Sequence, residues 1–369
     1  MAPTKDLPLT SISPSFGTIV VATGSRRWAT GCSVKGRRAG GWRMKKPVLA
    51  LLALALFACS VTSLAVSDIA IGLKWYHQAQ FAGFYIALDN GIYEDADLSV
   101  TLIEGGPEID KINLLLTGIV DFVVDSPEDL LIHRQAGDDV VAVAVLYQRS
   151  PLVFITRAES GILRPHDFIG KSAAILSADQ NELQFFAMVE KLGLDVNQVL
   201  LLPYDYDYSA FYEGSIDITL SYVNGGLIRL RDMGYGVNII WPGDYGVRGY
   251  SDTLITTQAM IDEHPDVVQR VVRASLAGWE QAISRPEQAV DSILRYAREP
   301  DRRLQREMML ASIPLLAVGT TPIGWMDLET WTSMIHVLTN YGVLAGGLDP
   351  ARVYDQRFVQ AIYGQEANR

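Results

Sequence analysis

The stretch DIAIGLKWYHQAQFAGFYIALDNGIYEDADLSVTLIEGGPEIDKINLLLTGIVDFVVD, residues 68–125, decides the fold class. It alternates apolar runs of strand length with segments whose apolar residues recur at helical spacing. The expected strands are residues 69–73, 98–103 and 120–124, and the expected helices are residues 80–89 and the segment striped by Ile109, Ile112 and Leu116. This order predicts an α/β fold with a largely parallel sheet covered by helices.

The same alternation continues along the rest of the chain. Ser126 and Pro127 open a further helix, since serine suits a cap and proline suits the first helical position. The remaining expected strands are residues 140–146, 153–156, 172–176, 216–220, 237–240 and 253–256. The remaining expected helices are residues 167–171, 181–192, 259–296 and 301–341, with Pro265 and Pro286 at helix starts.

This pattern predicts two lobes. The chain has 369 residues, 49% of them hydrophobic, which is enough for two separate cores. The strand at 253–256 returns the chain to the first lobe. The expected parts are residues 68–150 and 252–345 as lobe 1, residues 151–251 as lobe 2, and residues 346–369 as a tail that packs on lobe 1.

Charge is distributed unevenly. Nine of the 31 basic residues but only one of the 42 acidic residues precede Cys59, so the remainder carries a net charge of −19. A body with this much negative charge repels nucleic acid and anionic lipid, and we expect neither as a partner.

Both cysteines, Cys32 and Cys59, precede the body, which excludes a disulfide framework there. The five histidines lack metal-ligand spacing, so no metal site is expected.

Residues 44–58 have the order of an export signal. Met44 is followed by two lysines and then by an apolar run that is too short to span a membrane. Two cleavage sites remain open. Residues 56–59, Leu-Phe-Ala-Cys, are similar to a bacterial lipobox that would lipidate Cys59, whereas Ser63-Leu64-Ala65 suits ordinary cleavage. Residues 1–43 lack periodicity and indicate an extension or an over-called start.

Ligands of open parallel sheets bind beyond the carboxyl ends of the strands, which selects candidate residues here. The predicted ligand-binding residues are Trp75, His77, Gln80, Asp125, Ser126, Asp179, Asn181, Tyr222, Asn224 and Tyr245. They are aromatic, amide and carboxylate side chains, without Arg or Lys. Aromatic faces stack on flat rings and amides pair with ring nitrogens, so a neutral or cationic heteroaromatic ligand fits better than a phosphate or sulfonate.

Several of these residues have a structural alternative. Trp75 could be a core aromatic, His77 a hydrogen-bonded structural histidine, and Asp125 a helix cap. Tyr204, Tyr206 and Tyr208 could line the cleft rim or belong to a polar surface loop.

Residues 73–85, LKWYHQAQFAGFY, followed by Asn90-Gly91-Ile92-Tyr93 and Glu104-Gly105-Gly106, resemble the thiamine-pyrimidine-synthase-like family. The resemblance covers roughly residues 68–345 and extends to binding proteins for pyrimidine precursors, riboflavin and alkyl sulfonates. It implies a periplasmic-binding-protein-like fold (type II), with two lobes, two hinge crossings and a ligand cleft between the lobes.

The resemblance leaves three functions open. One is an extracytoplasmic solute-binding protein that serves an ABC permease and ATPase; we expect it to be monomeric and free of cofactors, and to bind a pyrimidine-precursor-like or riboflavin-like ring. Another is a ligand-sensing partner of a signalling protein. The last is a thiamine pyrimidine synthase that uses pyridoxal phosphate and histidine. Against the synthase, the resemblance places Asp125 and Asp129 where that enzyme has its lysine and histidine, and no cysteine follows Cys59. We therefore favour the binding protein.

Overall fold

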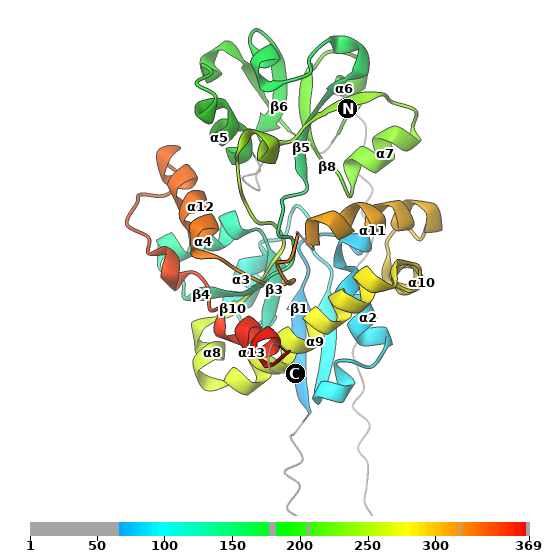
Figure 1. Cartoon of the computed structure of the whole chain (residues 1–369), viewed down its shortest axis with the longest axis vertical. Helices are drawn as coiled ribbons and strands as arrows, with labels where there is room; N and C mark the ends of the chain where they lie inside the picture. The colour runs from blue at the N-terminus through cyan, green and yellow to red at the C-terminus, as the bar shows by residue number, and fades with distance from the viewer. Residues whose placement is uncertain (1–65, 177–181, 205–206, 317–318, 367–369) are drawn as a thin grey trace, which may run out of the picture. The chain divides into compact units, whose positions relative to one another are not determined.

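The computed structural model describes residues 66–176, 182–204, 207–316 and 319–366. Within these residues the chain forms two mixed five-stranded sheets (Figure 1). The first has the order β2-β1-β3-β10-β4 and the second the order β7-β6-β8-β5-β9. We call each sheet with its helices lobe 1 and lobe 2. The α/β fold and its two sheets agree with the prediction.

The strands of the first sheet are β1 (Ser67–Gly72), β2 (Leu98–Ile103), β3 (Phe122–Asp125), β4 (Val140–Val145) and β10 (Thr253–Thr257). Those of the second are β5 (Leu152–Arg157), β6 (Ser172–Leu176), β7 (Leu200–Pro203), β8 (Ile218–Tyr222) and β9 (Val237–Ile240). The last strand of the first sheet is separated from the others by the whole of lobe 2, so the chain crosses twice between the lobes.

Helices cover both sheets. Lobe 1 contains α2 (Ala82–Asp89), α3 (Lys111–Leu116), α4 (Pro127–Ala136), α8 (Gln258–Glu263), α9 (Pro265–Ser284), α10 (Pro286–Tyr296), α11 (Arg302–Leu316), α12 (Leu328–Asn340) and α13 (Arg357–Glu366). Lobe 2 contains α5 (Leu183–Lys191), α6 (Ser209–Tyr212) and α7 (Gly226–Asp232). Short 3-10 helices are Ala79–Phe81, Glu94–Ala96, Ala158–Ser160, Pro165–Phe168, Val196–Gln198, Pro242–Tyr245 and Pro350–Arg352. Pro265 and Pro286 begin α9 and α10, as predicted. None of the described helices is long and apolar enough to cross a membrane.

The strand pairing differs from the prediction in two respects. β10 runs antiparallel to β3 and β4, and β5 runs antiparallel to β8 and β9, because each enters its sheet from the other lobe. The sheets are therefore mixed rather than largely parallel. β7 was not predicted, because its sequence Leu-Leu-Leu-Pro lacks alternation and ends in proline. It lies at the edge of its sheet, where Leu200 is exposed.

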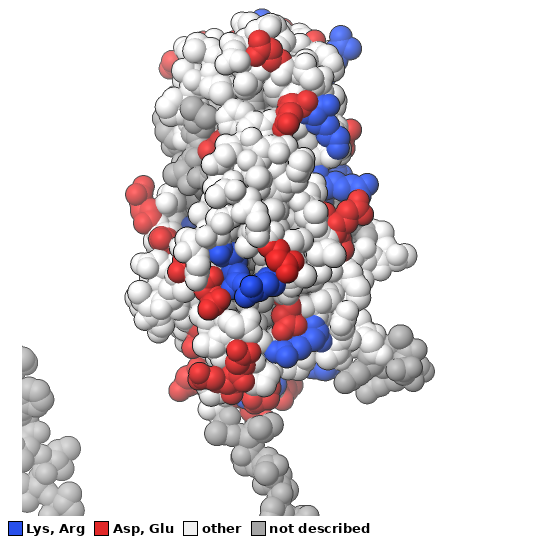
Figure 2. All heavy atoms as spheres, turned by 90° about the vertical axis from the view of Figure 1, so that its left-hand side faces the viewer, with Lys and Arg blue, Asp and Glu red and all other residues white. Residues whose placement is uncertain are grey.

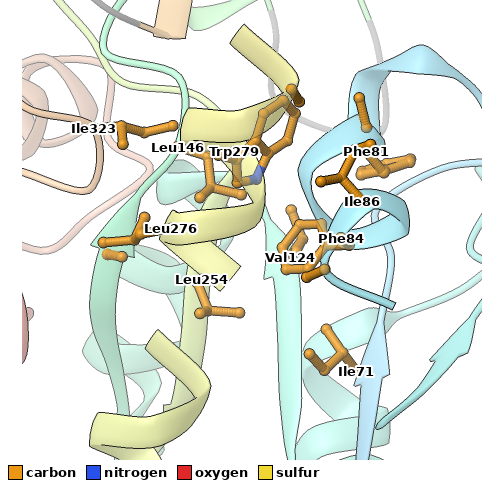
Figure 3. Close-up of a cluster of buried hydrophobic side chains, with 14 of the residues drawn as sticks. Ile71, Phe81, Phe84, Ile86, Val124, Leu146, Leu254, Leu276, Trp279 and Ile323 are labelled. Atoms are coloured by element: carbon orange, nitrogen blue, oxygen red, sulfur yellow. The ribbon is translucent and has the colours of Figure 1, made fainter. Parts of the chain in front are cut away.

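The core of lobe 1 depends on a close crossing of α2 and α9. Trp279 is fully buried and lies between Leu146 and the α2 side chains Phe84 and Ile86 (Figure 3). At the crossing, a Cβ on Gly83 would lie 2.2 Å from the Trp279 ring, and one on Gly278 would lie 2.2 Å from the Gly83 carbonyl oxygen. The two backbones touch, so both positions require glycine.

Acidic side chains gather at one end of lobe 1. On the face shown in Figure 2, Asp and Glu side chains cluster there, whereas Lys and Arg side chains are scattered among them. This distribution is consistent with the strongly negative charge of the chain beyond Cys59.

Candidate functional site

A cavity of about 220 Å³ lies between the lobes at the carboxyl ends of β1 and β8. From lobe 1 it is lined by the loop that follows β1. From lobe 2 it is lined by the end of β8, the start of α7 and the segment after β7. The described lining residues are Lys74, Trp75, Gln78, Gln80, Tyr204, Tyr208, Leu220, Ser221, Tyr222, Asn224, Gly225, Gly226 and Arg229. This is where open α/β sheets bind their ligands.

The Glu104-Gly105-Gly106 motif holds the loop that carries Trp75. The Gly105 N–H donates to the Trp75 carbonyl oxygen at 3.1 Å, and the His77 N–H donates to Glu104 Oε1 at 3.0 Å. A Cβ on Gly105 would lie 1.9 Å from the Leu73 carbonyl oxygen. The backbone can approach this closely only at glycine, so the motif positions the tryptophan against the cavity.

Tyrosines form the wall on the side of lobe 2. Tyr204 Oη donates to Tyr208 Oη at 3.2 Å, and Tyr208 Oη donates to Ser221 Oγ at 3.0 Å. A Cβ on Gly226 would lie 2.4 Å from Tyr208 Oη, so this glycine lets α7 begin directly beneath the phenol. Together with Trp75 and Tyr222, these side chains surround the cavity with flat aromatic surfaces, which suit a ring ligand.

A buried carboxylate lies beneath the wall formed by lobe 1. Asp252 is 1% exposed and accepts from Gln80 Nε2 at 2.7 Å, while Gln78 Nε2 donates to Gln80 Oε1 at 2.8 Å. Lys74 Nζ lies 3.9 Å from Asp252 Oδ1 and 5.9 Å from the centroid of the Tyr222 ring. Burial raises the pKa of Asp252, and the Lys74 ammonium opposes that shift.

Four of the predicted site residues line the cavity: Trp75, Gln80, Tyr222 and Asn224. Asn224 also joins the lobes, because its Nδ2 donates to Ser312 Oγ at 3.0 Å and to Tyr147 Oη at 3.3 Å. Trp75 is half-buried and also packs against the core of lobe 1, so the core alternative holds in part.

Four other predicted residues lie away from this cavity. His77 Nδ1 lies 3.0 Å from Tyr85 Oη, and burial lowers the pKa of His77, which favours its structural alternative. Asp125 Oδ1 accepts from the Ser126 N–H, and Ser126 caps α4. Tyr245, at the end of the 3-10 helix Pro242–Tyr245, packs on the core of lobe 2. Asp179 and Asn181 fall outside the described residues.

The sequence-based expectation of a site without Arg or Lys is wrong. Lys74 and Arg229 both line the cavity. Lys74 stands directly before Trp75, so the same strand-end rule could have found it. No signal in the sequence placed Arg229 at the site, because α7 was not predicted. Arg229 forms an ion pair with Glu299 of lobe 1 at the cavity edge, and Arg303 of α11 pairs with Asp232 of α7 at 2.7 Å.

Contacts between the lobes also occur near the crossing segments. Trp241 Nε1 donates to the Ser150 carbonyl oxygen at 3.2 Å, and the Ser251 N–H donates to the Tyr147 carbonyl oxygen at 3.0 Å. On the side of α12, Tyr341 Oη donates to the Phe186 carbonyl oxygen at 2.6 Å. Figure 1 shows α12 beside α5 and α11 beneath α7, so the lobes meet on both sides of the crossings.

Asp125, outside the cavity, is a second buried carboxyl with a raised pKa. It is 2% exposed, and burial raises its pKa to about 7, with the neighbouring Asp129 carboxylate adding to the rise. Lys111, whose Nζ lies 3.9 Å from Asp125 Oδ1, and Lys74 oppose it. This group titrates near neutral pH because its surroundings disfavour its charged form.

Comparison with known proteins identifies relatives over most of the chain. A family model described as "NMT1/THI5 like" matches residues 78–289. The chain is 28% identical over 305 residues to the formylaminopyrimidine-binding protein of Halalkalibacterium halodurans, covering 79% of this chain and 92% of that protein. It is 24% identical over 307 residues to the riboflavin-binding protein RibY of Chloroflexus aurantiacus, covering 80% and 86%.

Solved structures share the fold. The periplasmic aliphatic sulphonate binding protein SsuA from Escherichia coli matches with a TM-score of 0.64 at 13% identity, covering 79% of this chain and 92% of that one. At this identity the likeness shows the fold alone, which is a periplasmic-binding-protein fold with two lobes.

Proposed function

Since this chain belongs to the NMT1/THI5-like family, as its opening motif predicted, we propose that it is an extracytoplasmic solute-binding protein of an ABC importer. It binds a small heteroaromatic compound, of the pyrimidine-precursor or flavin type, by closing two lobes over the ring. The observation that carries this proposal is the cavity between the lobes, whose walls are the rings of Trp75, Tyr204, Tyr208 and Tyr222. The ligands named for the two relatives support it.

The mechanism follows from the two crossings between the lobes. Segments near Ser150 and Ser251 join the lobes, and hinge closure about such segments encloses a ligand without chemistry. Cavity residues come from both lobes, so the walls on either side of the ring are complete only when the lobes approach. The protein then presents the enclosed ligand to a permease and ATPase.

We expect a ring ligand to raise the melting temperature. At about a hundred times its dissociation constant, a ligand that binds only the native state adds roughly 2.7 kcal/mol to the free energy of unfolding. The measurement is a thermal-shift screen of aminopyrimidines, thiamine, riboflavin, pyridoxal phosphate and alkyl sulfonates. A stabilising pyrimidine or flavin that is recovered unchanged supports the proposal. Stabilisation by sulfonates alone would refute the ligand class.

The same samples test the enzymatic alternative. Incubation with pyridoxal phosphate and iron, followed by mass spectrometry, should yield no pyrimidine product. The position of Asp125 at the end of β3 and of Asp129 in the first turn of α4 supports this expectation, because a carboxylate cannot form the Schiff base that a lysine forms. Appearance of such a product would overturn the binding-protein proposal.

The proposal also covers export of the protein and its attachment to the membrane through a lipid. The basic, apolar and small-residue order of residues 44–59 supports removal of the leader and lipidation of Cys59, with a location at the outer face of the cytoplasmic membrane. Intact-mass analysis of the membrane-extracted protein should show a chain that starts at a lipidated Cys59. A chain that starts at Val66 would reject the lipid but keep export, whereas a full-length cytoplasmic chain would reject both.

A further inference from the structure

Helix α7 of lobe 2 both lines the cavity and contacts lobe 1. Gly226 and Arg229, in its first turns, are lining residues of the cavity. Arg229 pairs with Glu299 of lobe 1, and Nη2 of Arg303 in α11 lies 2.7 Å from Oδ2 of Asp232, the last residue of α7. One short helix is thus joined to the opposite lobe by two ion pairs (Figure 1). We call these two pairs the α7 latch.

The order of the charges determines how the two lobes meet. Along the chain, lobe 2 presents a positive and then a negative side chain, Arg229 and Asp232, and lobe 1 presents a negative and then a positive one, Glu299 and Arg303. A shift of one lobe by a helical turn would bring like charges together, which is unfavourable. Both pairs therefore form in one relative position of the lobes. The Arg303 guanidinium lowers the pKa of Asp232, in agreement with a formed pair.

Opening of the lobes must break this latch. The other ion pairs between the lobes, among the described residues, join Arg149 to Asp244 and Arg248 to Glu329. Both of these arginines lie beside the crossing segments, and groups close to a hinge move little when the hinge opens. The latch instead joins a helix of lobe 2 to the start of α11 in lobe 1, so its partners separate as the cleft opens.

Buried hydrogen bonds accompany the latch. Asn224, two residues before α7, lines the cavity and donates to Ser312 Oγ of α11 at 3.0 Å and to Tyr147 Oη at 3.3 Å. All three side chains are buried. These contacts and the latch join protein groups to protein groups, so they form before a ligand enters the cavity.

We propose that the α7 latch keeps a closed state of the two lobes populated before the ligand binds, and so sets the affinity through residues that do not contact the ligand. Asp232 and Arg303 are absent from the described lining of the cavity and act as positioning residues. Their side chains are 22% and 61% exposed, so the pair contributes modestly and shifts the equilibrium without locking it. The inference rests on the proposed function and adds a conformational control to it.

An exchange of charges across the latch tests this. Asp232→Arg and Arg303→Asp each place like charges opposite one another, and the double replacement restores an ion pair with its charges exchanged. We expect each single variant to lower the ratio of closed to open protein by about fivefold, and the double variant to recover it to within about twofold. The ratio is measured in the full-length chain, without added ligand, from the distance between spin labels at Ser215→Cys in lobe 2 and Ser284→Cys in lobe 1.

The labels and a control variant suit this chain. Both labelled serines are exposed, and Cys32 and Cys59, the only native cysteines, are replaced by serine. Asp291→Arg makes the same change of charge as Asp232→Arg at another exposed ion pair, with Arg302, that lies wholly within lobe 1. The closed fraction of this control should equal that of the wild type. Where a melting curve shows that a charge reversal does not fold, Asp232→Asn or Arg303→Gln replaces it, with an expected decrease of about twofold.

Affinity should follow the closed population. The probes are riboflavin and 4-amino-5-hydroxymethyl-2-methylpyrimidine, measured by calorimetry. When the closed state is the minor one, a compound that binds it should bind each single reversal about fivefold more weakly, and the double variant within about twofold of the wild type.

The outcomes separate this inference from the function on which it rests. Unchanged label distances in both single variants, or a wild-type protein that shows only the open distance, would overturn the latch and leave the binding protein intact. A shift that the double variant does not reverse would assign the effect to each residue's own lobe, and would overturn the latch as well. Failure of both compounds and of every other ring in the thermal screen to bind would instead remove the proposed function, while the label distances would still decide on the latch.

Discussion

Replacing Asp125 with asparagine should stabilise the protein at pH 8 more than at pH 5. Burial raises the pKa of the Asp125 carboxyl to about 7, against 3.8 for an unperturbed aspartate. Between these two values the native state binds a proton that the unfolded state releases. The free energy of unfolding of the wild-type protein therefore falls as the pH rises from about 4 to about 7. Above pH 7 the contribution of Asp125 to this free energy is constant.

Asparagine resembles the protonated carboxyl and removes this dependence. At pH 8 the free energy of unfolding of the variant should exceed that of the wild type by on the order of 4 kcal/mol. Between pH 5 and pH 8 this excess should grow by about 2 to 3 kcal/mol. Denaturant unfolding at both pH values measures it. Asp167→Asn is the control, because the Leu163 N–H lowers the pKa of that half-buried carboxyl, which is therefore ionised in both states from pH 5 to pH 8. This variant should be less stable than the wild type by the same amount at both pH values. A gap that is equal at pH 5 and pH 8 would show that Asp125 is ionised throughout.

Trp75→Ala should weaken binding of the ring ligand found in the thermal screen by about 2 kcal/mol, or roughly thirtyfold. Trp75 is half-buried and lines the cavity, so its removal deletes one of the flat surfaces against which a ring can stack. Calorimetry measures the affinity, and a melting curve should show only a small loss of stability.

Trp325→Ala is the matched control for this variant. Trp325 is also half-buried in lobe 1 and packs against the same core, but it does not line the cavity. Its loss should lower the melting temperature by a similar amount and leave the affinity unchanged. If both variants bind equally well, Trp75 is a core residue and the stacking proposal is wrong.

The sequence by itself determined most of the succession of strands and helices, and with it the α/β class. Apolar runs such as residues 98–103 and helix starts such as Pro265 are set by local spacing and backbone chemistry, so they can be read without the tertiary structure. The strand-end rule also selected Trp75, Tyr222 and Asn224, which line one cavity because the carboxyl ends of β1 and β8 face the same cleft; their role in binding stays a prediction.

Only the tertiary structure decided the polarity of the site. α7 lacks a local pattern strong enough to predict, so Arg229 could not be assigned to the cavity wall from its neighbours in sequence, whereas Tyr204 and Tyr208 do line the cavity, as one of the two sequence alternatives predicted. Asp252 lies 172 residues from Gln80, and its contact with that amide forms only when the second crossing segment returns to lobe 1. Long-range contacts of this kind are not visible in local sequence patterns, and that is why the residue types predicted a site without Arg or Lys while the fold places Lys74 and Arg229 at the cavity.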